Sequence, residues 1–182
     1  MSNRDLIRGL LTHVGENPDR EGLLETPDRV LKAWKHWCSG YDEDPSTILK
    51  TFEDGAEGFD EMVVVRDIDL FSHCEHHMAP FFGVAHVAYV PNGRIVGLSK
   101  INRLVECFAR RLQVQERIST QIADALYTHL QPLGVGVVIK ARHLCVASRG
   151  IRHTRSETVT SALRGCFKDE GSARSEFLAL CR

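Results

Sequence analysis

The chain has 182 residues, of which 43% are hydrophobic and 26% charged, and its formal net charge is −1. This length suits one domain with a real core and is too short for two ordinary domains. A charge so close to zero predicts neither nucleic acid nor an anionic membrane as a partner, so an anionic ligand would need a local cluster of lysine and arginine. The apolar runs are also far shorter than the roughly 20 residues of a membrane span.

The first residues, MSNRDLIRGLLTHV, carry acidic side chains within an amphipathic pattern, whereas a signal peptide has an uninterrupted apolar core. We therefore expect no export signal and a cytoplasmic protein in a reducing compartment. The cysteines are then predicted to be thiols or metal ligands and not a disulfide framework. They are Cys38, Cys74, Cys107, Cys145, Cys166 and Cys181.

Residues 1–60 are predicted to form an N-terminal helical segment. Leu6, Leu10 and their apolar neighbours recur at helical spacing and indicate a first short amphipathic helix. The stretch TPDRVLKAWKHWCSG, residues 26–40, predicts a second helix that starts with Thr26 as its cap and ends at Gly40.

Residues 61–182 are predicted to form a single structural unit of strands and helices. EMVVVRDIDLFS (61–72) and GVAHVAYVP (83–91) are β-rich, and residues 99–111 and 114–130 have helical periodicity. VGVVIKARHLCVAS (135–148) predicts another strand, ETVTSALRGCF (157–167) fits strand or helix, and SARSEFLALC (172–181) predicts a terminal helix. This order favours an α+β fold in which helices cover one face of an antiparallel sheet.

The segment FSHCEHHMAPFFG, residues 71–83, concentrates metal-binding side chains between two predicted strands. Cys74 and His77 have a spacing that lets a thiolate and an imidazole share one ion, and zinc suits that pair best. A third ligand is expected in RHLCVASRG, where His143 and Cys145 would point to the same side of a strand. Three protein ligands leave the fourth zinc position open for water, as in catalytic sites. Spacing alone leaves open that these residues are structural, because buried cysteines usually only pack.

A second group of residues predicts a nucleotide site. GRIVGLSKINR, residues 93–103, lacks the P-loop pattern but places Ser99 and Lys100 at a predicted helix start, with Arg103 one turn later. Arg149 adds a further cation, and Glu116 can accept paired N–H bonds from the edge of a guanine. Taken singly, a solvated helix end and a helix-surface charge explain the same residues.

Together these segments resemble the GTP cyclohydrolase I family. The matching motifs are CEHH with the following PFFG, GLSKINR, RLQVQER and H-x-C-x-x-x-RG, and the resemblance extends from ETPDR at 25–29 to SEFL at 175–178. It implies the tunnelling fold (T-fold), with a four-stranded antiparallel sheet, helices packed on one face and residues 61–182 as the catalytic domain. It also implies a homodecamer of two stacked pentameric rings with active sites between subunits.

The reaction implied by this resemblance is GTP plus water to 7,8-dihydroneopterin triphosphate plus formate, with Zn²⁺ as cofactor. Carried over position by position, the resemblance implies zinc ligands, catalytic histidines, triphosphate contacts and purine-recognition residues. The zinc ligands are Cys74, His77 and Cys145, and the catalytic histidines are His76 and His143. The triphosphate contacts are Ser99, Lys100, Arg103, Arg149 and, from another subunit, Arg29, and the purine-recognition residues are Gln115 and Glu116.

Two other functions share part of this pattern. A zinc-stabilised nucleotide-binding module would have the same ligands without needing His143. Another T-fold enzyme acting on a pterin or deazapurine would share the fold, but the CEHH segment has no signature of the nitrile-reductase branch.

Overall fold

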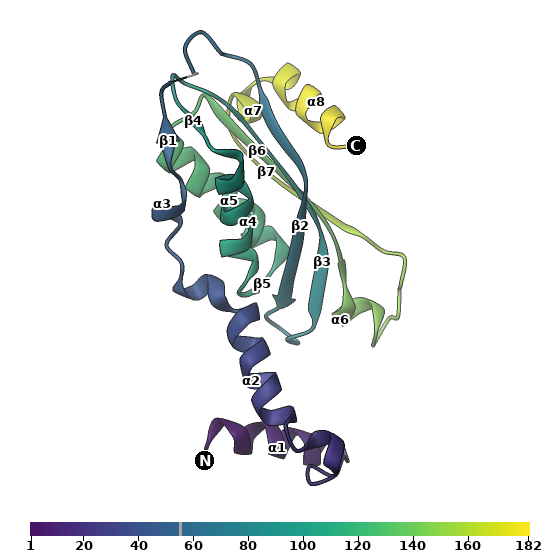
Figure 1. Cartoon of the computed structure of the whole chain (residues 1–182). Coiled ribbons are helices and arrows are strands. Elements are labelled where there is room, and N and C mark those ends of the chain that lie inside the picture. The colour runs from purple at the N-terminus through teal and green to yellow at the C-terminus, as the bar shows by residue number, and fades with distance from the viewer. Residues whose placement is uncertain (55) are drawn as a thin grey trace. The chain divides into compact units, whose positions relative to one another are not determined.

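The computed structural model describes residues 1–54 and 56–182 (Figure 1). The chain divides into two compact units, Met1–Ser39 and Gly40–Arg182. The boundary predicted at residue 60 lies inside the second of these units.

The first unit contains α1 (Asn3–His13), the 3₁₀ turn η1 (Glu21–Leu23) and α2 (Thr26–Trp37). A capping box starts α1, because the Ser2 hydroxyl accepts from the Asp5 N–H and the Asp5 carboxylate accepts from the Ser2 N–H. Both helices were predicted, but the limits of α2 differ from the prediction. Glu25 is its N-cap, Thr26 is already helical, and the helix ends three residues before Gly40.

The remaining elements lie in the second unit, apart from Ser39, the first residue of η2, which ends the first unit. They are η2 (Ser39–Asp42), α3 (Pro45–Ile48), β1 (Thr51–Phe52), β2 (Val63–Cys74), β3 (Pro80–Val90), β4 (Ile95–Val96), α4 (Leu98–Ala109), β5 (Leu112–Gln113), α5 (Gln115–Leu130), β6 (Gly134–His143), α6 (Leu144–Ala147), β7 (Thr158–Gly165), α7 (Cys166–Asp169) and α8 (Gly171–Leu180).

The main sheet has the strand order β5-β2-β3-β6-β7, and β1 and β4 form a separate two-stranded sheet. The four long strands are antiparallel to their neighbours, whereas the short β5 pairs with β2 in parallel. The α+β class is confirmed. The expected four-stranded sheet is extended by this parallel edge strand, so the sheet of the structure is mixed. Two residues are too short a periodic signal for a sequence pattern to reveal.

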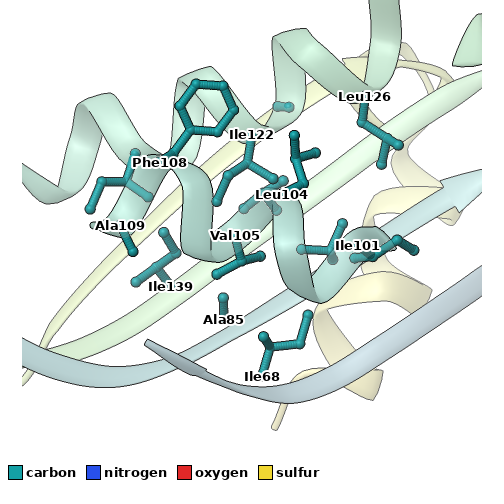
Figure 2. Close-up of a cluster of buried hydrophobic side chains, with 14 of the residues drawn as sticks. Ile68, Ala85, Ile101, Leu104, Val105, Phe108, Ala109, Ile122, Leu126 and Ile139 are labelled. Carbon is teal, nitrogen blue, oxygen red and sulfur yellow. The ribbon is translucent and has the colours of Figure 1, made fainter. Parts of the chain in front are cut away.

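The larger hydrophobic core lies between this sheet and the helices α4 and α5. Figure 2 shows Leu104 and Val105 of α4 and Ile122 of α5 facing Ala85 and Ile139 of the strands. All five side chains are fully buried. Burial of one leucine or isoleucine contributes about 1.5–3 kcal/mol, so this layer holds the two helices firmly on the sheet.

A second, smaller core lies on the opposite face of the sheet. Phe167 of α7 and Phe177 of α8 meet edge to face with ring centroids 5.4 Å apart and pack with Ala88 and Val138. The expectation that helices cover only one face is therefore wrong, since α7 and α8 cover part of the other face. Ala88 and Val138 alternate with residues of the first core along β3 and β6, which is how one strand serves two cores.

The strand predicted over 135–148 ends earlier than expected. β6 stops at His143, and Leu144–Ala147 form the single helical turn α6. Cys145 is thus on a helical turn, so strand alternation does not explain how it comes close to the other ligands. The ambiguous segment 157–167 is the strand β7 followed by the start of α7. The helix predicted near the C-terminus is confirmed as α8.

Within residues 1–54 and 56–182, no helix combines the length and the apolar character that crossing a bilayer requires.

His86 is a buried titratable group on the face of the sheet that α8 covers. The residue is 3% exposed, Nδ1 accepts from the Asp67 N–H at 3.2 Å, and Nε2 has no hydrogen-bond partner among residues 1–54 and 56–182. Burial lowers the pKa of His86 below its usual 6.5, the charges of Lys140 and Arg66 lower it further, and Asp67 opposes them. Cys181 lies near the same three charges. The folded protein therefore holds this imidazole neutral.

We expect His86 to make the protein less stable in mild acid. The unfolded chain takes up a proton near pH 6.5 and the folded chain only at lower pH, so the free energy of unfolding falls as the pH drops below about 6.5. His86→Gln stays neutral and keeps an acceptor for the Asp67 N–H, so it should show a weaker loss. Urea midpoints at pH 7.5 and 5.5 measure this difference, with the exposed His129→Gln as control. Equal pH dependence in His86→Gln and the unmodified protein would contradict the expectation.

Candidate functional site

Three potential metal ligands converge at the end of the sheet where β2 and β6 finish. One ligand atom each from Cys74, His77 and Cys145 lies within 4.8 Å of the other two. Within the part of the chain that the structure describes, this is the group of three such side chains that could hold a metal ion. Two segments about 70 residues apart in sequence therefore form one site.

The turn between β2 and β3 carries the first two of these ligands. It is closed by hydrogen bonds from the Met78 N–H to the Cys74 carbonyl, 2.8 Å, and from the Cys74 N–H to the Ala79 carbonyl, 2.9 Å. Met78 has φ 53°, a left-handed conformation that is costly for a residue with a side chain. The turn therefore holds a strained backbone at the site, a feature often found where function requires a particular geometry.

Glu75 links this turn to the start of α5. Its carboxylate accepts from both terminal nitrogens of Arg117, at 2.5 and 3.2 Å, and its N–H donates to the Gln113 carbonyl of β5 at 3.0 Å. The hydrogen bonds from Arg117 lower the pKa of the Glu75 carboxyl below its usual range. Paired donors of this kind fix orientation as well as distance. The two ligands on the turn are thereby held against the helix that carries Gln115 and Glu116.

The third ligand, Cys145, is half-buried on α6. Burial raises the pKa of its thiol, and the neighbouring Cys74 raises it further. Two thiols this close resist joint ionisation in water, whereas a divalent cation favours the thiolate form of both. Two sulfurs and an imidazole are the donor types that zinc prefers, so these residues fit a zinc ion.

His77 also contacts Arg149, whose guanidinium donates to His77 Nε2 at 2.9 Å. A neutral imidazole has one N–H and one lone pair, and this hydrogen bond uses the lone pair. A metal at Nε2 would take this lone pair, and a metal at Nδ1 would leave a hydrogen on Nε2, so a bound metal would displace this hydrogen bond. The contact places Arg149 next to the metal group.

The neighbouring histidine, His76, is exposed on the same turn. Its Nδ1 lies 3.7 Å from Cys74 Sγ, and its Nε2 lies 4.0 Å from the Glu75 carboxylate. His76 is therefore beside the metal group and open to a ligand.

His143, the last residue of β6, is held by the adjacent strand. Its ring stacks on Phe81 with centroids 4.4 Å apart and an interplanar angle of 10°. Phe81 and His143 are register partners in β3 and β6. The close approach of these strands requires Gly83, because a Cβ there would lie 1.9 Å from the Lys140 carbonyl oxygen. The PFFG segment thus places a flat aromatic surface under the imidazole.

Gln115 and Glu116, at the start of α5, lie in different environments. Gln115 is 1% exposed, and its side chain bonds His143 and atoms of β6 and β7. Glu116 is exposed. Burial lowers the pKa of His143, and the negative charge of Glu116 partly opposes this shift. Of these two residues, Glu116 is the one whose side chain is free to meet a ligand.

The predicted phosphate contacts on α4 are not brought to the metal group within one chain. Ser99, Lys100 and Arg103 lie at the start of α4, whereas the end of α4 leads into β5, which pairs with Cys74. From Ser99 to Arg110 the helix rises about 16 Å. Figure 1 likewise shows β4, which precedes α4, at the opposite end of the sheet from α6. Arg29 belongs to the first unit, where it is exposed and paired with Glu25.

The sequence pattern missed several residues that organise this site. Arg117 donates to Glu75, Phe81 stacks on His143, and Thr160 accepts a hydrogen bond from Gln115. Phe81 belongs to the PFFG motif and Arg117 to the RLQVQER motif, and these motifs are the sequence signal that could have identified them. Thr160 lies in β7, and its contact with Gln115 depends on strand pairing.

The sequence comparisons with known proteins agree on one family. The sequence profile of the family described as GTP cyclohydrolase I matches residues 3–182. A GTP cyclohydrolase 1 of Janthinobacterium sp. (strain Marseille) is 65% identical over 175 residues, which cover 96% of this chain and 88% of the relative. A GTP cyclohydrolase 1 of Nitrosospira multiformis is 58% identical over 171 residues, 94% of this chain and 90% of the relative. Among solved structures, an archaeosine synthase QueF-Like in the apo form is similar with a TM-score of 0.45 and 18% identity, covering 57% of this chain and 93% of that one.

Proposed function

The chain belongs to the GTP cyclohydrolase I family and is an enzyme that acts on GTP, and from this premise we propose that Cys74, His77 and Cys145 bind a zinc ion at its active site. The reaction is the hydrolytic opening of the guanine imidazole ring of GTP at C8, which releases formate and gives 7,8-dihydroneopterin triphosphate. The observation that carries the assignment of the metal site is the convergence of the three ligand atoms within 4.8 Å. When bound there, zinc would supply Lewis-acid activation of a water molecule at neutral pH.

The side chains beside the metal group supply proton transfer and orientation. His143 is proposed to exchange a proton with the guanine ring as it opens, because its ring is fixed by Phe81 and its lowered pKa keeps it neutral at pH 7. His76, exposed beside Cys74, is proposed to assist proton transfer or to orient the water and ribose. Glu116 is proposed to accept the paired N–H groups of the guanine edge, a pattern that adenine does not present.

The triphosphate is proposed to anchor GTP in the site and to stay uncleaved during the reaction. Ser99, Lys100, Arg103, Arg149 and Arg29 are the residues proposed to bind it. Arg149 is next to the metal group, where its guanidinium donates to His77 Nε2 at 2.9 Å. The four cationic residues of this set would use the charge of the triphosphate to orient C8 of the guanine.

We expect GTP to bind far more tightly than guanosine. Three or more charge-assisted hydrogen bonds, each worth about 1.5–3 kcal/mol, predict a difference of about 1,000-fold or more. The difference should grow as the salt concentration falls, because exposed charges are screened by salt. Competition of both ligands against a fluorescent GTP analogue at two salt concentrations measures this. Equal affinities would remove the proposed role of the cationic residues.

We further propose a homodecamer of two stacked pentameric rings, with residues 61–182 as a T-fold catalytic domain and active sites between subunits. The separation of Lys100 from Cys145 within one chain supports a site completed by a neighbouring subunit.

This proposal of shared sites predicts complementation between two inactive variants. When Lys100→Ala and Cys145→Ser chains are unfolded together and refolded, some mixed sites should contain both intact residues and regain activity. The same variants refolded separately and then mixed are the control. Activity that never exceeds the control would contradict sites shared in this way.

The decisive experiment for the function is GTP turnover with and without a zinc chelator. We expect formate and a pterin that becomes fluorescent on oxidation, both lost with chelation and restored by zinc. A nucleotide-binding module would bind GTP without releasing formate, and a T-fold enzyme of other specificity would leave GTP unchanged. Either result would refute the proposed reaction.

A further inference from the structure

Gln115 is almost fully buried, and its amide nitrogen is bound entirely within the protein. Nε2 donates to the Ile139 carbonyl at 3.1 Å, the Thr158 carbonyl at 2.9 Å and Thr160 Oγ1 at 3.2 Å. With two N–H groups and three acceptors, no donor of this amide is left for a ligand. A direct contact between these N–H groups and the purine, which the family resemblance implied, therefore does not fit the described geometry.

The surroundings of Gln115 determine which way its amide faces. Main-chain carbonyl oxygens only accept hydrogen bonds, so the NH₂ end must point to Ile139 and Thr158. The reverse orientation would set the amide oxygen against two carbonyl oxygens and lose the three hydrogen bonds that Nε2 donates. Oε1 is consequently the atom that faces His143 Nε2, at 2.8 Å.

A hydroxyl chain supports the same orientation. The Ser119 hydroxyl donates to the Gln115 main-chain carbonyl at 3.1 Å, so it accepts from the Thr160 hydroxyl 2.6 Å away. Thr160 then has used its only proton, and its oxygen is free to accept from Gln115 Nε2. Every donor and acceptor in this group has one consistent role.

From this network we propose that Gln115 is a positioning residue that holds His143 as the Nε2–H tautomer, so that His143 exchanges protons with the substrate through Nδ1. Because Gln115 Oε1 can only accept, Nε2 of His143 must carry a hydrogen. The neutral ring then has its lone pair on Nδ1. The proton taken up or released in the reaction is on Nδ1, while the Nε2 proton stays in the bond to Gln115.

This inference rests on the proposed function, since it assigns the working atom of the proposed acid–base residue. It differs from the role that the resemblance implied for Gln115. A side chain that read the purine would change discrimination between substrates. A side chain that orients the imidazole would change the rate of proton transfer and leave substrate binding unaffected.

The tautomer can be read directly in the zinc-loaded enzyme. Magic-angle-spinning NMR of protein labelled with ¹⁵N-histidine, at pH 8 and without substrate, distinguishes protonated from unprotonated ring nitrogens. The His143 signals are assigned by their absence in His143→Gln. We expect a protonated Nε2 and an unprotonated Nδ1. A protonated Nδ1 in the unmodified enzyme would overturn the proposal without any further variant.

Gln115→Met tests the effect on the reaction with little change in side-chain volume. We expect kcat for GTP to fall about 10- to 100-fold, the range typical when a partner that orients an active-site group is lost. KM for GTP and the preference for GTP over ITP, which lacks the 2-amino group, should not change. His143 should also show a mixture of tautomers.

Gln121→Met is the matched control, because Gln121 is on the same helix and accepts from Gln113 Nε2 at 2.7 Å, away from His143. It should keep the kcat and the His143 signals of the unmodified enzyme. If Gln115→Met matches this control, or changes the preference between GTP and ITP with kcat intact, the inference is wrong. If the proposed function itself were wrong, the unmodified enzyme would release no formate from GTP, which is a different result.

Discussion

Replacing Cys145 with serine is expected to abolish zinc binding and turnover together. A serine hydroxyl is a much weaker zinc ligand than a thiolate, and the two remaining ligands, Cys74 and His77, do not complete a tight site. Loss of a residue that only orients a zinc ligand already costs about 10- to 100-fold in affinity or activity. Loss of the ligand itself should therefore reduce formate release about 100-fold or more. Zinc content by atomic absorption and formate release from GTP measure both effects on the same preparation.

The matched control for this variant is Cys38→Ser. Cys38 is half-buried in the first unit, and burial raises the pKa of its thiol without involving the metal group. It should keep full zinc and full turnover. A purified Cys145→Ser protein with normal zinc and normal activity would show that Cys145 is not a ligand. A protein that keeps zinc but loses turnover would show that its sulfur serves the reaction in another way.

Replacing His143 with alanine should reduce formate release without reducing zinc binding. His143 is not a member of the group of three ligands, so zinc should be retained. Formate release should fall about 10²- to 10⁴-fold, the usual contribution of a positioned acid–base group. Zinc content and single-turnover formate release are the two measurements. The result contrasts with Cys145→Ser, in which both quantities should fall.

The alanine variant also loses the stacking on Phe81 and leaves Gln115 Oε1 without a donor. Some loss of stability is therefore expected, and thermal unfolding has to be measured beside activity. His129→Ala, at an exposed position of α5, is the control and should retain activity. Unchanged formate release in a folded His143→Ala protein would remove His143 from the mechanism, and loss of zinc would instead make it a partner of the metal site.

Local sequence patterns were sufficient to predict the type and approximate position of most long helices and strands. Helical periodicity in 99–111 and 114–130 and β-rich runs in 61–72 and 83–91 correspond to α4, α5, β2 and β3 within a few residues. These patterns succeed because a helix or strand that buries one side must repeat its apolar residues at its own period. The same patterns did not reveal β5 or α6, which are too short to repeat.

The sequence by itself determined the identities of the side chains at the site. A cysteine and a histidine three residues apart, a second Cys–His segment and a cationic helix start specify which atoms are present and which chemistry they can perform. Only the tertiary structure decided which of these atoms meet. In the structure, Cys145 lies on a helical turn and Gln115 is buried. Lys100 lies most of a helix length away from the metal group. The physical reason is that spacing along the chain reports local geometry, whereas contacts between distant segments depend on strand register and on how helices pack against the sheet.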